Sequence, residues 1–424
     1  MSASAWKKCR LRDIAYIYRG GNFQKNDFTP EGKPCIHYGQ MYTHFGTFTD
    51  KVLTYLPEDI FKKSRIAVSN DVIMAITSET VEDVCRCIAW IGKEDIAISG
   101  HTAIIHHQQD AKFLSYYFHS ASFFTQKSRV AHGSKVIEMN PSDLEKTTII
   151  FPKDPEEQQR IASILSTCDT VIQKTQKTID KYKAIKQGMM QDLFTRGLTK
   201  DGKLRPSFKD APELYKESEL GMIPQEWEVK ELGDLCNSIG DGLHGTPSYE
   251  SNTELYFING NNLDNGVINL SNAEEISEIS YQKNMLDLSE KTLLLSINGT
   301  IGNVAFYNGE KILLGKSAAY INTKNINKYF LMYYVQTEYF SRYLNKVLTG
   351  STIQNLSLDS IRKMLVIDCE EQTAIAARLS SMDTTIQKEE AILTKYKNIK
   401  TGLMAHLLTP PADATIIDET GETL

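Results

Sequence analysis

Residues 157–195, EQQRIASILSTCDTVIQKTQKTIDKYKAIKQGMMQDLFT, recur in altered form as residues 371–409, EQTAIAARLSSMDTTIQKEEAILTKYKNIKTGLMAHLLT. The two segments align without a gap at an offset of 214 residues, and about half of their positions are identical. A repeat of this length is not a chance event, and it indicates that the chain is a tandem duplication. The fold must therefore be one plan used twice.

Both repeated segments have the pattern of a long helix. Apolar or nearly apolar residues follow one another at alternating steps of four and three, which is the seam of a coiled coil. Thr175 and Lys186 are imperfect members of the first seam. A helix of this length spans roughly 58 Å, too far to bury its stripe on one small domain. We therefore expect the two helices to pack on each other.

The direction of the pair follows from connectivity. The first helix carries the chain away from the first globular segment, and a linker over 198–226 leads into the second one. The second helix can then run back, so the pair should be antiparallel, with one globular domain at each end and a pseudo-two-fold between them. The globular segments contain short β-branched runs such as DVIMAITS and TLLLSINGT, with helical stretches later in each. This pattern indicates an α+β fold.

The segments that precede the repeats match only at their edges. Trp6 and Asp13 recur with the same spacing as Trp227 and Asp234, and Gly133-Ser134 recurs as Gly350-Ser351. Between these points the two halves diverge. A shared frame with different contents indicates one fold that performs two related but distinct recognition tasks.

The composition argues against several protein classes. The chain has no run of about 18 apolar residues, and the stretch MSASAWKKCRLRD lacks the apolar core of a signal peptide. We therefore expect a cytoplasmic protein without a membrane partner. The net charge is −6, so any binding of DNA must rest on local patches and not on overall attraction.

No catalytic or metal-binding motif stands out. Gly315-Lys316-Ser317 lacks the earlier glycine of a phosphate-binding loop, because residue 310 is Glu. The seven cysteines are scattered, and the histidines at 101, 106 and 107 do not supply a recognisable set of convergent ligands. We expect no catalytic residue and no metal site.

The arrangement resembles the specificity subunits of type I restriction-modification systems, over nearly the whole chain. The matching features, each present twice, are the Trp-x6-Asp edge, a variable domain, Gly-Ser, a Glu-Gln-x-x-Ile-Ala segment and the long helix. Gly299-Thr300-Ile301-Gly302-Asn303 also looks like a loop of this family, whereas the first half departs there and reads SETVED at 78–83. Transfer of individual residues is therefore weaker in the first half.

The resemblance implies a fold of two target recognition domains joined by a long antiparallel two-helix coiled coil. The expected order is a first target recognition domain at 1–153, a first long spacer helix at 154–197 and a linker at 198–226. A second target recognition domain at 227–367, a second long spacer helix at 368–409 and a disordered acidic tail at 410–424 follow.

The resemblance also implies partners and cofactors. Each variable domain would read one half of a bipartite target in double-stranded DNA, and the helices would set the spacer and dock two methyltransferase (modification) subunits. Restriction subunits, the motor and nuclease, would complete the full complex. The chain itself would hold no cofactor, since S-adenosylmethionine, ATP and Mg²⁺ would belong to the partner subunits.

Candidate DNA-contacting residues carry suitable donors, acceptors or positive charge and fall in predicted loops. For each of them an ordinary solvated loop residue is the alternative. They are Gln40, Tyr42, Lys62, Lys63, His101, Gly133, Ser134 and Lys135 in the first domain, and His244, Asn261, Asn262, Asn298, Thr300, Lys316, Ser351 and Thr352 in the second.

Candidate partner-binding residues are those that the two helices share. A duplicated surface suggests two equivalent partners. These residues are Glu157, Gln158, Lys181, Tyr182 and Lys183 on the first helix, and Glu371, Gln372, Lys395, Tyr396 and Lys397 on the second.

Two other classes compete with a DNA-specificity subunit. A structural coiled-coil scaffold without sequence readout would not need two divergent domains framed by nearly identical edges. A stand-alone enzyme should show at least one catalytic constellation. The sequence therefore favours the specificity subunit.

Overall fold

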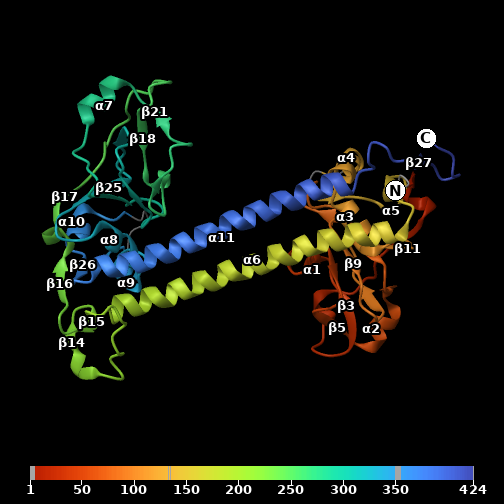
Figure 1. Cartoon of the computed structure of the whole chain (residues 1–424), viewed down its shortest axis with the longest axis horizontal. Coiled ribbons are helices and arrows are strands. Elements are labelled where there is room, and N and C mark those ends of the chain that lie inside the picture. Colours follow the sequence, from red (N-terminus) through yellow and green to blue (C-terminus); the bar gives the residue numbers. More distant parts are fainter. Residues whose placement is uncertain (1–4, 132, 134, 349–354, 424) are drawn as a thin grey trace. The chain divides into compact units, whose positions relative to one another are not determined.

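The structure is a computed structural model, and it describes residues 5–131, 133, 135–348 and 355–423. The chain divides into two compact units, one formed by Met1–Lys177 with Glu390–Leu424 and the other by Thr178–Glu389. Each unit holds one globular domain and a part of both long helices (Figure 1). The sequence predicts each long helix as a segment separate from the two globular domains. The units divide the helices instead, because each domain packs on the start of one helix and the end of the other.

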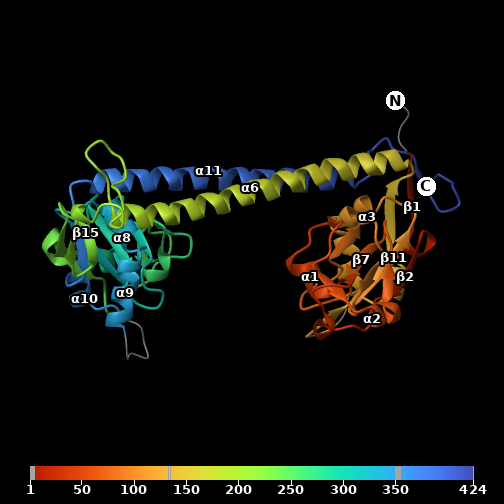
Figure 2. The same ribbon diagram turned by 90° about the horizontal axis from the view of Figure 1, so that it is seen from below.

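The domain of the first unit is a mixture of short strands and short helices. Its largest sheet has five strands in the order β2-β11-β7-β9-β4, and helix α3 packs on β9 and β7 (Figure 2). A second sheet has the order β5-β3-β10-β6, in which β3 and β10 are parallel. The strands are β1 (Trp6–Arg10), β2 (Ala15–Arg19), β3 (Lys33–Ile36), β4 (Phe48–Thr49), β5 (Thr54–Leu56), β6 (Arg65–Ala67), β7 (Val72–Ala75), β8 (Thr77–Ser78), β9 (Cys87–Trp90), β10 (Ile96–Ile98), β11 (Thr102–His107), β12 (Ile137–Glu138) and β13 (Thr148–Pro152). The helices are α1 (Tyr38–Thr43), α2 (Glu58–Lys63), α3 (Ala111–Phe118), α4 (Ala121–Val130), α5 (Pro141–Leu144) and the long α6 (Pro155–Thr195).

The domain of the second unit repeats this plan. Its main sheet has the order β17-β25-β22-β23, and the parallel pair β18 and β24 takes the place of β3 and β10. Its strands are β14 (Tyr215–Ser218), β15 (Gly221–Pro224), β16 (Glu228–Glu231), β17 (Cys236–Asp241), β18 (Tyr256–Ile258), β19 (Leu263–Asp264), β20 (Val267–Ile268), β21 (Glu274–Glu275), β22 (Thr292–Ser296), β23 (Val304–Phe306), β24 (Ile312–Leu314), β25 (Ala318–Thr323) and β26 (Leu365–Asp368). Its helices are α7 (Glu278–Asn284), α8 (Lys328–Tyr334), α9 (Glu338–Val347), α10 (Leu358–Arg362) and the long α11 (Gln372–Leu407). The expected mixture of strands and helices in each half is therefore present.

The segment after α11 differs from the expected disordered tail. Strand β27 (Ile416–Ile417) pairs in parallel with β1, with Trp6 opposite Ile416. The backbone N–H of Trp6 also donates to the carbonyl oxygen of Thr415, at 2.8 Å. The edge of β1 offers backbone N–H and C=O groups with which the tail can pair. The acidic composition of the tail gives no sign of this pairing. The prediction of disorder was wrong for these residues.

The two long helices run antiparallel within each unit. In the first unit, Ile161 and Leu165 near the start of α6 share a hydrophobic core with Leu403 and Leu407 near the end of α11. In the second unit the roles are exchanged, and the start of α11 packs on the end of α6. Among the described residues, no helix has the length and hydropathy needed to cross a bilayer.

A partly buried ion pair joins the helices to the domain in the first unit. The Lys400 ammonium on α11 lies 2.5 Å from the Asp169 carboxylate on α6. The hydroxyl of Tyr116, on α3, donates to the other oxygen of Asp169 at 2.7 Å. The ammonium also lies 5.4 Å from the centre of the Tyr116 ring. One carboxylate therefore fixes two helices and the domain at a single point.

The second unit contains the same cluster with the helices exchanged. Lys186 on α6 lies 2.6 Å from Asp383 on α11, and the Tyr333 hydroxyl on α8 donates to Asp383 at 2.6 Å. Burial and the neighbouring carboxylate raise the pKa of both tyrosines, so each phenol remains a donor. Lys186, one of the two imperfect seam residues, is therefore accommodated in the seam by its ion pair with Asp383. We call these two groups the Tyr-Asp-Lys clusters.

Removal of one carboxylate should destabilise the first unit. In Asp169→Ala the ammonium of Lys400 and the hydroxyl of Tyr116 lose their shared partner in a site that is about four-fifths buried. We expect a loss of about 2–3 kcal/mol in the free energy of unfolding, the usual contribution of hydrogen bonds to a charged group. Denaturant unfolding measures it, with Lys177→Ala, an exposed change on the same helix, as the control. Equal stability of both variants would contradict the assigned role.

Candidate nucleic-acid interface

Three loops of the first unit meet where strands of its two sheets end. They are residues 20–22 after β2, residues 37–40 after β3, which form the N-cap and first turn of α1, and residues 99–101 between β10 and β11. The N–H of Gly21 donates to the carbonyl of Ile98 at 2.7 Å, and the N–H of Tyr38 donates to the Ser99 hydroxyl at 2.8 Å. We call this group the first strand-end cluster.

The second unit has an equivalent group at the same strand ends. Its loops are residues 242–244 after β17, residues 259–262 after β18 and residues 315–317 between β24 and β25. The N–H of Leu243 donates to the carbonyl of Leu314 at 2.7 Å, and the N–H of Gly260 donates to the Ser317 hydroxyl at 2.9 Å. We call it the second strand-end cluster.

The two clusters share a hydrogen-bonded scaffold. In the first, the Gln40 side-chain oxygen accepts from the N–H of His37 at 3.0 Å. In the second, the Asn262 side-chain oxygen accepts from the N–H of Asn259 at 2.9 Å. Each pair closes a capping box at the end of a strand. The same local geometry is therefore built from different residues.

The exposed side chains on this scaffold differ between the units. The first cluster presents the exposed His101 ring, 5.2 Å from the half-buried Tyr38 ring. The second presents Lys316 and His244, whose imidazole lies 2.7 Å from the Asp241 carboxylate. Side chains of this kind can donate to phosphates and to base edges. A backbone geometry that both units share, with different exposed side chains on it, is suited to recognition of two different sequences.

Several candidates of the first domain lie in short helices and not in the predicted loops. Gln40 and Tyr42 belong to α1, and Lys62 and Lys63 belong to α2. Gln40 serves the capping box, and the Tyr42 hydroxyl donates to the carbonyl of Thr77. Burial raises the pKa of Tyr42 to about 12. These two side chains therefore have roles inside the fold.

The other candidates of the first domain are more exposed. His101 lies in the first strand-end cluster. Lys62 is paired with Glu58, at 3.4 Å, and Lys63 is exposed. Gly133 and Lys135 are exposed on a separate loop, and Ser134 lies outside the described residues.

In the second domain the structure brings three candidates together. The Lys316 backbone carbonyl accepts from the Asn298 amide at 3.2 Å, and its N–H donates to the carbonyl of Leu243, next to His244. Asn261 is exposed beside them, but Asn262 is buried and serves the capping box. Thr300 is exposed on the neighbouring loop, whereas Ser351 and Thr352 lie outside the described residues.

Sequence reasoning missed Tyr38 in the first cluster and Asn259 and Ser317 in the second. The Ser317 hydroxyl donates to the Asn259 side chain at 2.9 Å, which ties two loops together. The Asn-x-x-Asn spacing of 259–262 is the one local signal of a capping box that could have marked this loop.

Three candidate partner-binding residues are occupied inside the chain. Gln158 is 1% exposed and its amide donates to the carbonyl of Pro152, while Gln372 accepts from the N–H of Asn327. The Glu371 carboxylate accepts from the Trp227 indole at 2.7 Å and pairs with Arg205. The repeated glutamine therefore has a structural reason, since it anchors the start of each helix to its domain, and Glu371 adds to this anchor in the second helix.

The remaining partner-binding candidates lie on the helix surfaces. Glu157 forms an ion pair with Arg160 at 2.8 Å. The four lysines of the two Lys-Tyr-Lys elements are exposed and the two tyrosines are partly exposed, at Lys181, Tyr182, Lys183, Lys395, Tyr396 and Lys397.

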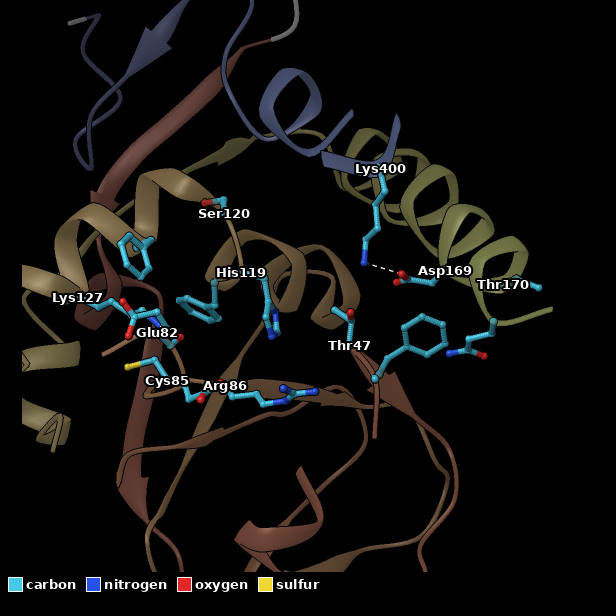
Figure 3. A pocket seen from close by; sticks show the side chains of 16 residues that line it. Thr47, Glu82, Cys85, Arg86, His119, Ser120, Lys127, Asp169, Thr170 and Lys400 are labelled. Atoms are coloured by element: carbon cyan, nitrogen blue, oxygen red, sulfur yellow. Dashed lines mark hydrogen bonds and ion pairs between the residues drawn. The ribbon is translucent and has the colours of Figure 1, made fainter. Parts of the chain in front are cut away.

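A cavity of about 580 Å³ in the first unit is lined by polar and charged side chains, but its thiol and amines are not activated nucleophiles (Figure 3). Burial raises the pKa of the Cys85 thiol on its wall to about 12, so this thiol is not an activated nucleophile. The Lys127 ammonium donates to the carbonyls of Glu82 and Val84, and Lys400 is held by Asp169. Across the described part of the chain, no three His, Cys, Asp or Glu side chains are grouped as metal ligands.

The duplicated architecture matches a known family. A family profile described as the type I restriction modification DNA specificity domain matches residues 3–183 and 224–398, once in each half. The chain belongs to this family. Its function is accordingly that of a DNA specificity subunit of a type I restriction-modification system.

Individual specificity subunits are similar to this chain over most of its length and of their own. The "Putative type I restriction enzyme MjaX specificity subunit" of Methanocaldococcus jannaschii is 26% identical, over 95% of this chain and 93% of the relative. The type I restriction enzyme MjaVIII specificity subunit of the same organism is 27% identical, over 82% and 81%.

Solved structures share the fold. The type I restriction-modification S subunit from M. genitalium has a TM-score of 0.57 at 15% identity, and covers 97% of this chain and 98% of its own. A chain from a structure of complex assembly and conformational transition of the type I R-M system has a TM-score of 0.55 at 14% identity, covering 95% and 97%. At these identities the specificity subunit shares the fold with them, and no residue role is transferred.

If the second strand-end cluster contacts DNA, Lys316→Ala should weaken binding to all sequences. The exposed Lys316 ammonium would neutralise one phosphate, so its loss should reduce the slope of log affinity against log salt by about one. DNA titrations of the assembled complex at several salt concentrations measure this slope. Lys324→Ala is the matched control, because Lys324 is also exposed but follows the opposite end of β25. Equal effects of the two changes would argue against the assigned face.

Proposed function

We propose that each unit of this specificity subunit reads one half of a bipartite target in double-stranded DNA. The observation that carries the proposal is the pair of strand-end clusters, in which one scaffold bears different exposed side chains. Hydrogen bonds to base edges specify a sequence, whereas contacts to phosphates only position the protein. Two clusters with different tips would therefore read two different half-sites.

The long helices set the distance between the half-sites. Their antiparallel packing within each unit supports a pseudo-two-fold arrangement in which α6 and α11 hold one domain at each end. Domains that contact the same side of the duplex bind half-sites about one helical turn apart, roughly 34 Å. The spacer of the target is then a property of the helices.

The helix surfaces dock two methyltransferase subunits. Lys181 and Tyr182 recur as Lys395 and Tyr396, and an exposed isoleucine follows at the same spacing each time. Ile185 is 40% exposed and Ile399 is 43% exposed. Aromatic and apolar side chains ringed by charge are typical of the centre of a protein interface. Two copies of one surface fit two copies of one partner.

The chain acts without catalysis of its own in this proposal. S-adenosylmethionine, ATP and Mg²⁺ are used by the methyltransferase and restriction subunits of the complex. The specificity subunit supplies binding energy and geometry, and the partners supply the chemistry.

Exchange of residues 14–132 for the corresponding segment of a related subunit tests the assignment of half-sites. Because this segment contains the first strand-end cluster, one half of the target should change and the other should stay. Sequencing of methylated sites after assembly with the methyltransferase subunits reads out the target. A simultaneous change of both halves would contradict separate readout.

Lengthening both helices tests their role as the spacer. Seven residues inserted after Lys177 and after Ala391 preserve the heptad seam and lengthen each helix by about 10 Å. We expect the same half-sites with a spacer longer by about 3 base pairs, at 3.4 Å per base pair, or loss of specific binding if the added twist is not absorbed. Selection from a library of variable spacers measures the preference. Full-strength binding to the original spacer would show that the helices do not set it.

A further inference from the structure

One residue of the first strand-end cluster has an unusual backbone. His101 has a φ of 63°, in the left-handed region that side chains with a Cβ rarely adopt. Such a conformation costs stability and is retained where the surrounding structure enforces it, often at a functional site. Ser317, at the matching position of the second unit, does not have a positive φ.

The side chain of His101 is held by a series of rings. Its imidazole lies 5.2 Å from the Tyr38 ring, Tyr38 lies 4.6 Å from His37, and His37 lies 5.8 Å from Phe28. His37 is buried and Tyr38 is half-buried, whereas His101 is exposed. Within the part of the chain that the structure describes, the imidazole of His101 has ring contacts but no hydrogen bond. The imidazole therefore packs beside Tyr38 while its nitrogens remain available.

Two exposed cations belong to the segments around this cluster. Gly21 lies against both the backbone of Arg65 and the loop that carries His101. The backbone of Arg65 is therefore next to the cluster. Lys25 lies near His37, whose pKa is lowered by burial and by the charges of Lys25 and His101. Both cations are exposed, and neither forms an ion pair with a described residue. An exposed imidazole in a cluster that also carries two available cations is suited to the DNA surface, where phosphates border the base edges.

The second unit does not have space for this ring pair. Gly260 occupies the position of Tyr38, and a Cβ there would lie 2.8 Å from the carbonyl oxygen of Ser317 and 2.9 Å from the side chain of Ser296. No larger residue fits without movement of the backbone. The ring pair is therefore specific to the first unit, although the scaffold is shared.

We propose that His101 reads a base of the first half-site, that Tyr38 is its positioning residue, and that Lys25 and Arg65 contact the flanking phosphates. This proposal rests on the proposed function, in which the first unit reads one half-site. An imidazole N–H can donate to the N7 acceptor of a purine or the O6 of guanine in the major groove, where every base pair is distinguishable. The ligand is thus a base edge in the duplex that presents an acceptor to the major groove.

The test uses the full chain assembled with its methyltransferase subunits. His101→Gly removes the ring and suits the left-handed backbone, so it should fold at least as stably as the parent. Selection from duplexes with both half-sites randomised should show a preference reduced by about 5- to 150-fold at one or two positions of one half-site, from the usual worth of a base contact. Positions of the other half-site should not change.

Two further variants complete the comparison. His44→Ala removes an exposed imidazole at the end of α1, and should leave the target unchanged. The double variant Lys25→Ala with Arg65→Ala should weaken binding to all sequences and reduce its salt dependence, with no change of target.

Two results would overturn the proposal. One is an unchanged preference in His101→Gly, and the other is an equal loss in both half-sites, which would indicate a general effect on binding. Failure of the proposed function has a different signature, because the parent complex would then select no bipartite sequence. Thermal unfolding of each variant separates loss of readout from loss of folding.

Discussion

A carboxylate held between a lysine and a tyrosine is the interaction on which the rest of the structure depends. Asp169 connects α6 to α11 through Lys400 and to the domain through Tyr116. Its counterpart Asp383 does the same in the second unit. An apolar seam alone tolerates a shift by one heptad, because one leucine replaces another. A charged residue in the seam does not, since a shift would leave it buried without its partner.

The strand-end clusters show how a duplicated fold can diverge where it matters for recognition. Gln40 and Asn262 close equivalent capping boxes in the two units. The Ser99 and Ser317 hydroxyls accept from equivalent backbone N–H groups, those of the residue after each N-cap. These polar side chains are used by the fold and are not free to meet DNA. The residues that project beyond them differ between the units, so sequence preference can change without a change of scaffold.

The sequence predicted the helices well because a heptad pattern is local and continuous. In the heptad pattern Lys186 is an imperfect seam residue, because its partner Asp383 lies 197 residues away and nothing in the pattern connects them. The strand-end clusters were only partly predicted for a related reason. Asn262 and Asn298 have the same chemistry in the sequence, but the fold buries one as a cap and leaves the other partly exposed beside Lys316. The pairing of β27 with β1 was missed because a two-residue strand has no pattern of its own.

The first unit is built from two segments that are far apart in the sequence, and this affects the order in which the units fold during translation. Asp169 and Lys400 are 231 residues apart, and β1 gains its neighbour β27 only after α11. At a synthesis rate of about 5–20 residues per second, roughly 10–50 seconds separate the two halves of this unit. The second unit is continuous from Thr178 to Glu389 and needs no such delay. During translation the domain that is made first is therefore completed last, and the face of its half of α6 that packs on α11 stays exposed to solvent until α11 is made.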